Sequence, residues 1–270
     1  MPATPPRFSI ADVWDETSAF VRREAGLLMP LAFATTGVSA LLWDLAVPAP
    51  LQGMRPQPGL WLLVLIPVTL LLLIGNIATA ALVLHGGISV REALRTAIER
   101  IGNAVLLLLL FTAVAAGATV IVTLIALAAG AAVGWGAQQA TTLAVLLLLP
   151  VLLFLGIRLL TLWPVIAVSP ATPAPIRVLK RAYGTTRGVF GRLALAALLY
   201  GLAYLVLLTA IQFGLGSVLL LIGRATGQAE AAGLVIAILT ALAGAAVQAV
   251  WGVYAAIAYR RLSADSSGIA

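Results

Sequence analysis

The sequence predicts an all-α protein, a polytopic transmembrane helical bundle with six spans that forms one integral membrane domain over residues 1–270. Its composition leads to this class, because 62% of the residues are hydrophobic and 9% are charged, whereas soluble domains have about 25% charged residues. Long uncharged runs reach the roughly 20 residues that a helix needs to cross a bilayer, without the alternation of a barrel strand. These observations exclude a soluble enzyme, a nucleic-acid-binding protein and a disordered protein.

Charged side chains delimit the spans, because each costs a few kcal/mol at the middle of a membrane. The first span lies between Glu24 and Asp44. The uncharged stretch between Arg100 and Arg158 is long enough for two spans, and a segment rich in glycine, glutamine and threonine at 134–142 divides it. The six predicted spans are 25–43, 60–84, 104–129, 142–166, 193–222 and 231–258.

The basic residues predict how the spans are oriented. Fourteen of the 16 Lys and Arg residues lie on one side, at the termini and around the connections after the second and fourth spans, and only Arg55 and Arg224 lie on the other. Connections rich in Lys and Arg stay in the cytoplasm, so we predict that both termini are cytoplasmic. Acids and prolines in the first 16 residues, where a signal peptide has its apolar core, predict that no signal is cleaved.

Each cytoplasmic segment that leads into an odd-numbered span has the pattern of a short amphipathic helix, which we term an elbow. The first elbow begins at Ser9, and the second begins at Ser89, which with Glu92 matches a capping box. In the third elbow, 172–188, Ile176, Leu179 and Tyr183 fall roughly on one face, and the pattern is the weakest because Lys180 falls on this apolar side too. Such helices either lie in the membrane interface or pack on the inner ends of the bundle, and the sequence is compatible with both.

The elbows also suggest three helix-hairpin repeats, each made of an elbow, an outward span and a return span. The first unit is 8–47, and its return span is 60–84. The second unit is 88–168, and the third is 174–259. A repeat would explain this order. Any hairpin protein that obeys the positive-inside rule would show the same basic elbows, so both interpretations stay open.

The residues that carry catalytic or metal chemistry are scarce. The chain has no cysteine and a single histidine, His85, so no metal-ligating cluster is expected. Ser217, a possible nucleophile, lies near the outer face, about 30 Å from the plane of His85. None of the predicted spans contains Asp or Glu, which argues against a proton-coupled pump. We therefore expect no catalytic residue, no metal site and no cofactor.

Three polar residues share one depth in the membrane. Asn76, Arg158 and Gln248 are the 17th or 18th residues of the three spans that run from outside to inside. We predict that they face the bundle interior as one polar layer. The alternatives are amides that only bond neighbouring helices and an arginine that extends to the cytoplasmic interface.

The third elbow and its surroundings predict a lipid-binding surface. From residue 159 to residue 223 the chain has five basic residues and no acidic one. Each basic residue near an anionic surface contributes about 1 kcal/mol, so we expect anionic membrane lipids as partners on the cytoplasmic side. The predicted contacts are Arg177, Lys180, Arg181, Arg187 and Arg192. The alternative is that these charges only fix the topology.

One segment carries a family resemblance. In 158–199, an arginine near the end of the fourth span leads through a proline to an elbow that ends in a Thr-Arg-Gly-x-Phe turn. The matching residues are Arg158, Pro164, Thr186, Arg187, Gly188, Phe190 and Arg192. The pattern resembles the membrane domain of glycerophosphoryl diester phosphodiesterases and related uncharacterised bacterial six-helix integral membrane proteins. It departs at Ala182-Tyr183, where Ser-Trp is common, and at Gly191, where an aromatic residue is common.

The resemblance implies a protein of the bacterial inner membrane and brings no enzyme with it, because the chemistry of that family sits in an appended barrel of about 250 residues. We therefore expect a non-enzymatic integral membrane protein, an accessory or envelope-associated module. The alternative is a transporter or channel for a lipid-like or small substrate, with a water-accessible cavity at the predicted polar layer. An enzyme acting on lipids would need converging acids, histidines or a nucleophile–base pair, which the sequence lacks.

Overall fold

The computed structural model describes residues 9–46, 59–170 and 174–267, and all regular elements in these ranges are helices. Six helical segments are long and apolar enough to cross a membrane, which confirms the predicted fold class. The elements are α1 (Ile10–Ala32), η1 (Phe33–Gly37), α2 (Val38–Ala46), η2 (Leu60–Val64), α3 (Leu65–His85), α4 (Val90–Val133), α5 (Ala137–Arg158), α6 (Leu162–Val168), α7 (Pro175–Thr185), α8 (Phe190–Thr209), η3 (Ala210–Leu215), α9 (Gly216–Ala225) and α10 (Ala229–Ser267).

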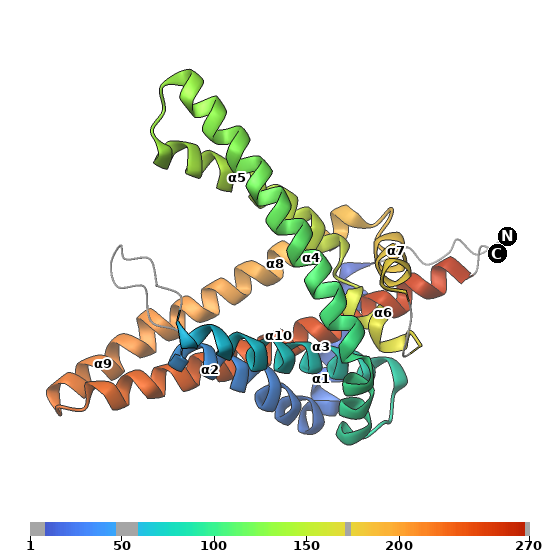
Figure 1. The fold of residues 1–270 in the computed structure, drawn as a ribbon. Helices are drawn as coiled ribbons and strands as arrows, with labels where there is room; N and C mark the ends of the chain where they lie inside the picture. The colour runs from blue at the N-terminus through green and yellow to red at the C-terminus, as the bar shows by residue number, and fades with distance from the viewer. Residues whose placement is uncertain (1–8, 47–58, 171–173, 268–270) are drawn as a thin grey trace.

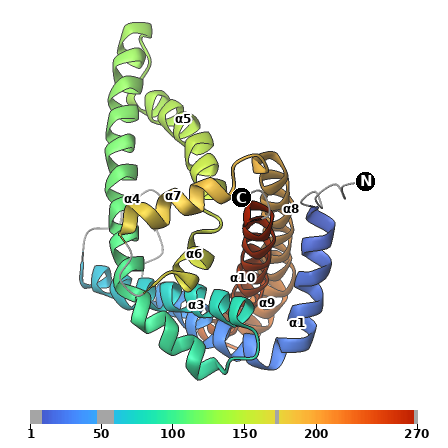
Figure 2. The ribbon, with the colours of Figure 1, turned by 90° about the vertical axis from the view of Figure 1, so that its right-hand side faces the viewer.

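The helices form three hairpins that diverge from a common end. The first joins α1 and α2 to α3, the second joins α4 to α5, and the third joins α8 and α9 to α10. Figure 1 shows that α1 begins and α10 ends at the same end of the molecule, and that the second and third hairpins leave it in different directions. In Figure 2 the α4–α5 hairpin stands away from the other helices.

The first two elbows are continuous with the spans that follow them. The second elbow and the third span form the single 44-residue helix α4, which begins with the expected capping box between Ser89 and Glu92. Its predicted apolar stripe packs inward, with Ala93 and Ala97 fully buried. In the first elbow, Ser9 accepts a hydrogen bond from the Asp12 amide, and α1 continues through the π-helical turn η1 into α2. These elbows therefore pack on the bundle, with Val13 of the first elbow also fully buried.

The fourth span, predicted as 142–166, lies within one apolar helical segment, Gln138–Val168, but this segment is broken: α5 ends at Arg158 and the chain turns before α6. Pro164 favours the break, since a proline ring clashes with the carbonyl four residues earlier in a continuous helix, although α5 itself continues through Pro150. Pro164 is instead the third residue of the short helix α6, where an amide N–H has no partner within the helix.

The third elbow is the separate helix α7, and its buried face differs from the expected one. Val178 and Ala182 are buried against the bundle, whereas Ile176 and Tyr183, which we placed on the apolar side, are 60% and 44% exposed. The helix contacts α4, α6 and α10. The third elbow is therefore packed on the inner ends of the other helices.

The last helix, α10, organises the core through its small residues. A side chain at Gly252 would meet Thr79 of α3, and one at Gly244 would meet the Tyr204 hydroxyl of α8. The Gly244 and Gly252 positions thus serve packing within the chain. At its end, Arg260 and Arg261 pair with Glu16 of α1, with 2.9 Å between Arg261 Nε and Glu16 Oε2.

The orientation can be tested with single cysteines, because the natural chain has none. Gly184 lies at the end of α7, whereas Gln138 lies at the far tip of the α4–α5 hairpin. If the elbows are cytoplasmic, Gly184→Cys resists an impermeant thiol reagent in intact cells and Gln138→Cys reacts. The reverse labelling pattern would invert the orientation. Of the basic residues that predict it, Arg7 and Arg55 lie outside the described residues.

The closest contact in the first hairpin gives a test of packing. A methyl group added at Gly75 would lie 2.9 Å from the Thr35 Cβ, and such overpacking costs about 1–3 kcal/mol, more than the gain of about 1 kcal/mol in helix propensity. We expect Gly75→Ala to lower the thermal unfolding midpoint in detergent. Gly26→Ala, with open space around the new methyl, is the control. Adding Thr35→Ala to Gly75→Ala removes the Thr35 hydroxyl oxygen, which is the nearest atom, but keeps the Cβ, so the midpoint should recover in part. No recovery would contradict this account.

Candidate functional site

A cavity of about 660 Å³ lies between α4, α5, α6 and α7. Its volume falls within the range of about 300–1,000 Å³ that is typical of ligand sites. Nine of its 18 lining residues are leucines, and Lys180 is the single charged residue among those that line it. The cavity is therefore suited to an apolar ligand with its polar part at one end.

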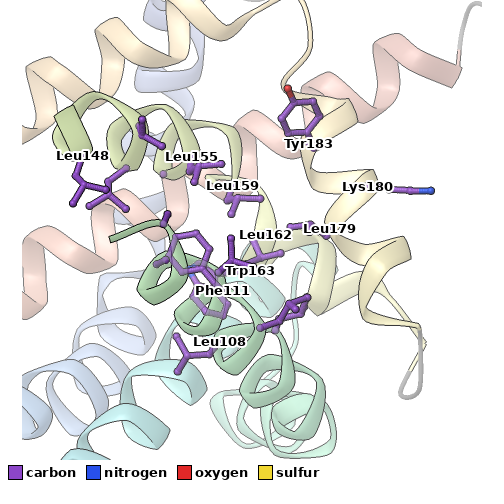
Figure 3. Close-up of a pocket in the computed structure, with 18 residues that line it drawn as sticks. Leu108, Phe111, Leu148, Leu155, Leu159, Leu162, Trp163, Leu179, Lys180 and Tyr183 are labelled. Atoms are coloured by element: carbon purple, nitrogen blue, oxygen red, sulfur yellow. The ribbon is translucent and has the colours of Figure 1, made fainter. Parts of the chain in front are cut away.

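Figure 3 shows how the lining residues are arranged. Leu108 and Phe111 come from α4, Leu148 and Leu155 come from α5, and the turn after α5 and helices α6 and α7 supply the remainder. Lys180 extends outward from α7 with its Nζ away from the leucine side chains. Its stem thus lines the cavity while its charge stays at the rim, as is usual for lysines at membrane interfaces.

The width of the α4–α5 hairpin changes along its length, and this change creates the cavity. Near the tip, small residues let the two backbones approach, and a side chain at Gly130 would lie 3.2 Å from the Ala140 Cβ. Ala126 and Ala144 are also buried there. Toward the other end, α6 and α7 contact α4, so the hairpin opens around leucines such as Leu148.

Three threonines fasten α7 to the end of α5, and we name them the threonine clasp: Thr161, Thr185 and Thr186. The buried Thr161 hydroxyl lies 3.2 Å from the Ala182 carbonyl oxygen and 2.9 Å from Thr185 Oγ1. Thr186 donates to the Arg158 carbonyl at 3.3 Å. These bonds satisfy carbonyls at the helix ends and hold α7 against the cavity.

Arg158 is the last residue of α5, and its guanidinium lies among three aromatic rings. Its Cζ is 5.3 Å from the ring centre of Phe154, 4.8 Å from that of Tyr183 and 5.1 Å from that of Phe190. Its Nε and Nη1 atoms are buried, with no hydrogen-bond partner in the described part of the chain. None of the ion pairs there includes Arg158.

Two of the three residues predicted to form a polar layer lie together in the structure. Gln248 Nε2 donates to Asn76 Oδ1 across 3.5 Å, between α10 and α3. Arg158 does not join them, because its guanidinium is directed to the corner between α7 and α8. Position along the spans could not predict which way each side chain faces. Phe154, one turn before Arg158, was a signal that we missed.

The five basic residues predicted to bind lipid are distributed around the third elbow. All five are exposed. Lys180 lines the cavity, and the Arg181 guanidinium lies over the ring of Tyr259, 5.9 Å from its centre. Arg177 is on α7, whereas Arg187 and Arg192 flank the start of α8. The structure thus brings one of them to the cavity and leaves the others around it.

A second cavity, of about 370 Å³, lies on the other side of α5, where the second and third hairpins diverge. Tyr200 and Trp251 line it with their rings stacked, 4.3 Å between centres. Leu152 and Gly156 line both cavities. At Gly156 an added Cβ would have no neighbour within 4 Å, so α5 has free space along this face.

Residues with catalytic potential lie apart. Among the described residues, no three His, Cys, Asp or Glu side chains come together as metal ligands. The Ser217 hydroxyl donates to the carbonyl of Phe213 in its own helix at 2.6 Å, and His85 Nδ1 lies 3.1 Å from the Ala81 carbonyl. Each of these two side chains thus bonds a carbonyl of its own helix.

Comparisons with protein-family models, with curated proteins and with solved structures find no match to this chain.

The threonine clasp gives a direct test of how the cavity is held. Thr161→Val keeps the side-chain shape and removes both hydrogen bonds, and an unpaired buried polar group costs about 1–3 kcal/mol. We expect a lower unfolding midpoint and faster proteolysis at α7. Thr119→Val on the lipid-exposed face of α4 is the control, because it removes only a bond within its own helix. It should leave the unfolding midpoint and the rate of proteolysis unchanged. Equal effects of the two changes would contradict the role of the clasp.

Proposed function

We propose that this integral membrane protein is a non-enzymatic lipid-binding module of a bacterial inner membrane. Its ligand is an anionic lipid of the cytoplasmic leaflet, held with an acyl chain in the cavity between α4 and α7. The observation that carries the proposal is the apolar 660 Å³ cavity with Lys180 as its single charged lining residue. The resemblance of 158–199 to membrane domains of bacterial phosphodiesterases stays part of the same proposal.

The energetics of a membrane favour recognition through the headgroup. Lipid tails are as apolar as leucine, so burying a chain in the cavity gains little over leaving it in the bilayer. Charge near an anionic headgroup contributes about 1 kcal/mol per basic residue. The third elbow supplies basic residues without any acid from 159 to 223. The cavity therefore fixes the position of the lipid, while the charges select it.

Passage of a polar substrate has less support. A channel or transporter for such a substrate needs a wet, polar path, whereas the wall of the cavity is leucine-rich and the Asn76–Gln248 pair lies outside it. A lipid-like transported substrate would use the same cavity. Binding is the simpler proposal, because charge is found at one end of the cavity alone.

Filling the cavity tests the proposal. Gly156→Leu places a side chain in the open space beside α5, and we expect about tenfold weaker retention of phosphatidylglycerol in native mass spectrometry, equivalent to about 1.4 kcal/mol. Gly117→Leu is the matched control, because Gly117 is an exposed glycine of α4 that does not line the cavity. Undiminished retention in Gly156→Leu would refute a lipid in this cavity.

A further inference from the structure

The guanidinium of Arg158 has unused hydrogen-bonding capacity. It is partly buried, two of its nitrogens have no partner among the described residues, and no carboxylate pairs with it there. Donors of a charged group that stay buried and unbonded cost free energy. A partly buried guanidinium with unbonded donors therefore indicates that an anionic ligand binds here.

The three rings around Arg158 hold its position without satisfying its donors. Cation–π attraction of about 0.5–2 kcal/mol acts on the face of a guanidinium, whereas its N–H groups point outward in its plane. A fixed guanidinium of this kind matches a phosphate, which accepts two parallel hydrogen bonds. Lysine at the same place would keep the charge and lose that geometry.

Tyr183 connects Arg158 to the cavity. Its ring lies over the guanidinium, and the same residue lines the cavity. Lys180, one helical turn earlier on α7, lines the rim beside it. Phe154 and Tyr183, which cover the guanidinium, are themselves 39% and 44% exposed. Exposed side chains change rotamer on the picosecond-to-nanosecond timescale. Such a movement of either ring can open access to the N–H groups of Arg158.

We infer that Arg158 binds the phosphate of the lipid whose acyl chain occupies the cavity between α4 and α7. The inference rests on the proposed function and adds the chemistry that it selects: a phosphate-bearing glycerolipid, rather than any anionic lipid. Lys180 contributes charge at the rim, and Arg158 contributes the two directed bonds.

The first experiment uses the unmodified protein and a matched pair of anionic probes. Phosphatidylglycerol and glucuronosyl diacylglycerol can carry the same chains and the same net charge, but only the first has a phosphate. In native mass spectrometry the protein should retain phosphatidylglycerol about tenfold better. Equal retention would overturn the phosphate site and leave the lipid cavity standing. Displacement of phosphatidylglycerol by millimolar inorganic phosphate would overturn it also, because the site would then serve free phosphate.

The second experiment changes the residue. Arg158→Lys keeps the charge and should reduce phosphatidylglycerol retention about tenfold while leaving retention of glucuronosyl diacylglycerol unchanged. Lys180→Gln should weaken both lipids alike, by about fivefold, and Arg224→Gln, outside the site, should weaken neither. Unchanged phosphatidylglycerol retention in Arg158→Lys would overturn the inference. If Arg158→Lys retains phosphatidylglycerol but Gly156→Leu loses it, the lipid cavity stands and the phosphate site alone fails. If neither change reduces retention, the phosphate site and the lipid cavity both fail.

Discussion

The bilayer core contains no water, so each polar group inside a span must find its partner in the protein. The structure meets this requirement mostly within single helices, as where Thr35 and Ser39 donate to carbonyls of their own helical turns. Asn76 also donates to a carbonyl one turn earlier, which leaves its oxygen for Gln248. Polar residues therefore join helices only where two spans are adjacent, and α3 and α10 are such a pair.

The same requirement explains the corner between α5 and α8. The chain leaves α5 at Arg158, before Pro164, a residue that disfavours a continuous helix, and the carbonyls at that end then need donors. Thr186 at the end of α7 donates to the Arg158 carbonyl, and Thr161 in the turn donates in the other direction, to the Ala182 carbonyl of α7. These bonds fix α7 across the open end of the α4–α5 hairpin. The break before Pro164 thus helps to shape the cavity between α4 and α7.

The sequence predicted those features that depend on hydropathy and local chemistry. The number of spans, the Ser89 capping box and an apolar stripe at the start of α4 follow from charge spacing and helical periodicity, and the structure agrees. The sequence left open whether this stripe faces the membrane or the bundle, and the structure packs it on the bundle. It could not predict the direction of Arg158, because depth along a helix says nothing about rotation relative to neighbours. The face of α7 was wrong for a related reason: periodicity finds an apolar stripe, but Val178 and Ala182 pack inward because of what lies beside them.

The contact between the first and last helices bears on the order in which the protein is made. Helix α1 packs against α10, and Glu16 pairs with Arg260 and Arg261 near the end of the chain. Synthesis runs from the N-terminus, so α1 is inserted long before its main partner exists. The surface of α1 that packs against α10 must therefore be covered by lipid or by another protein until translation is complete. The contact between α1 and α10 therefore forms only after all the helices between them have been made.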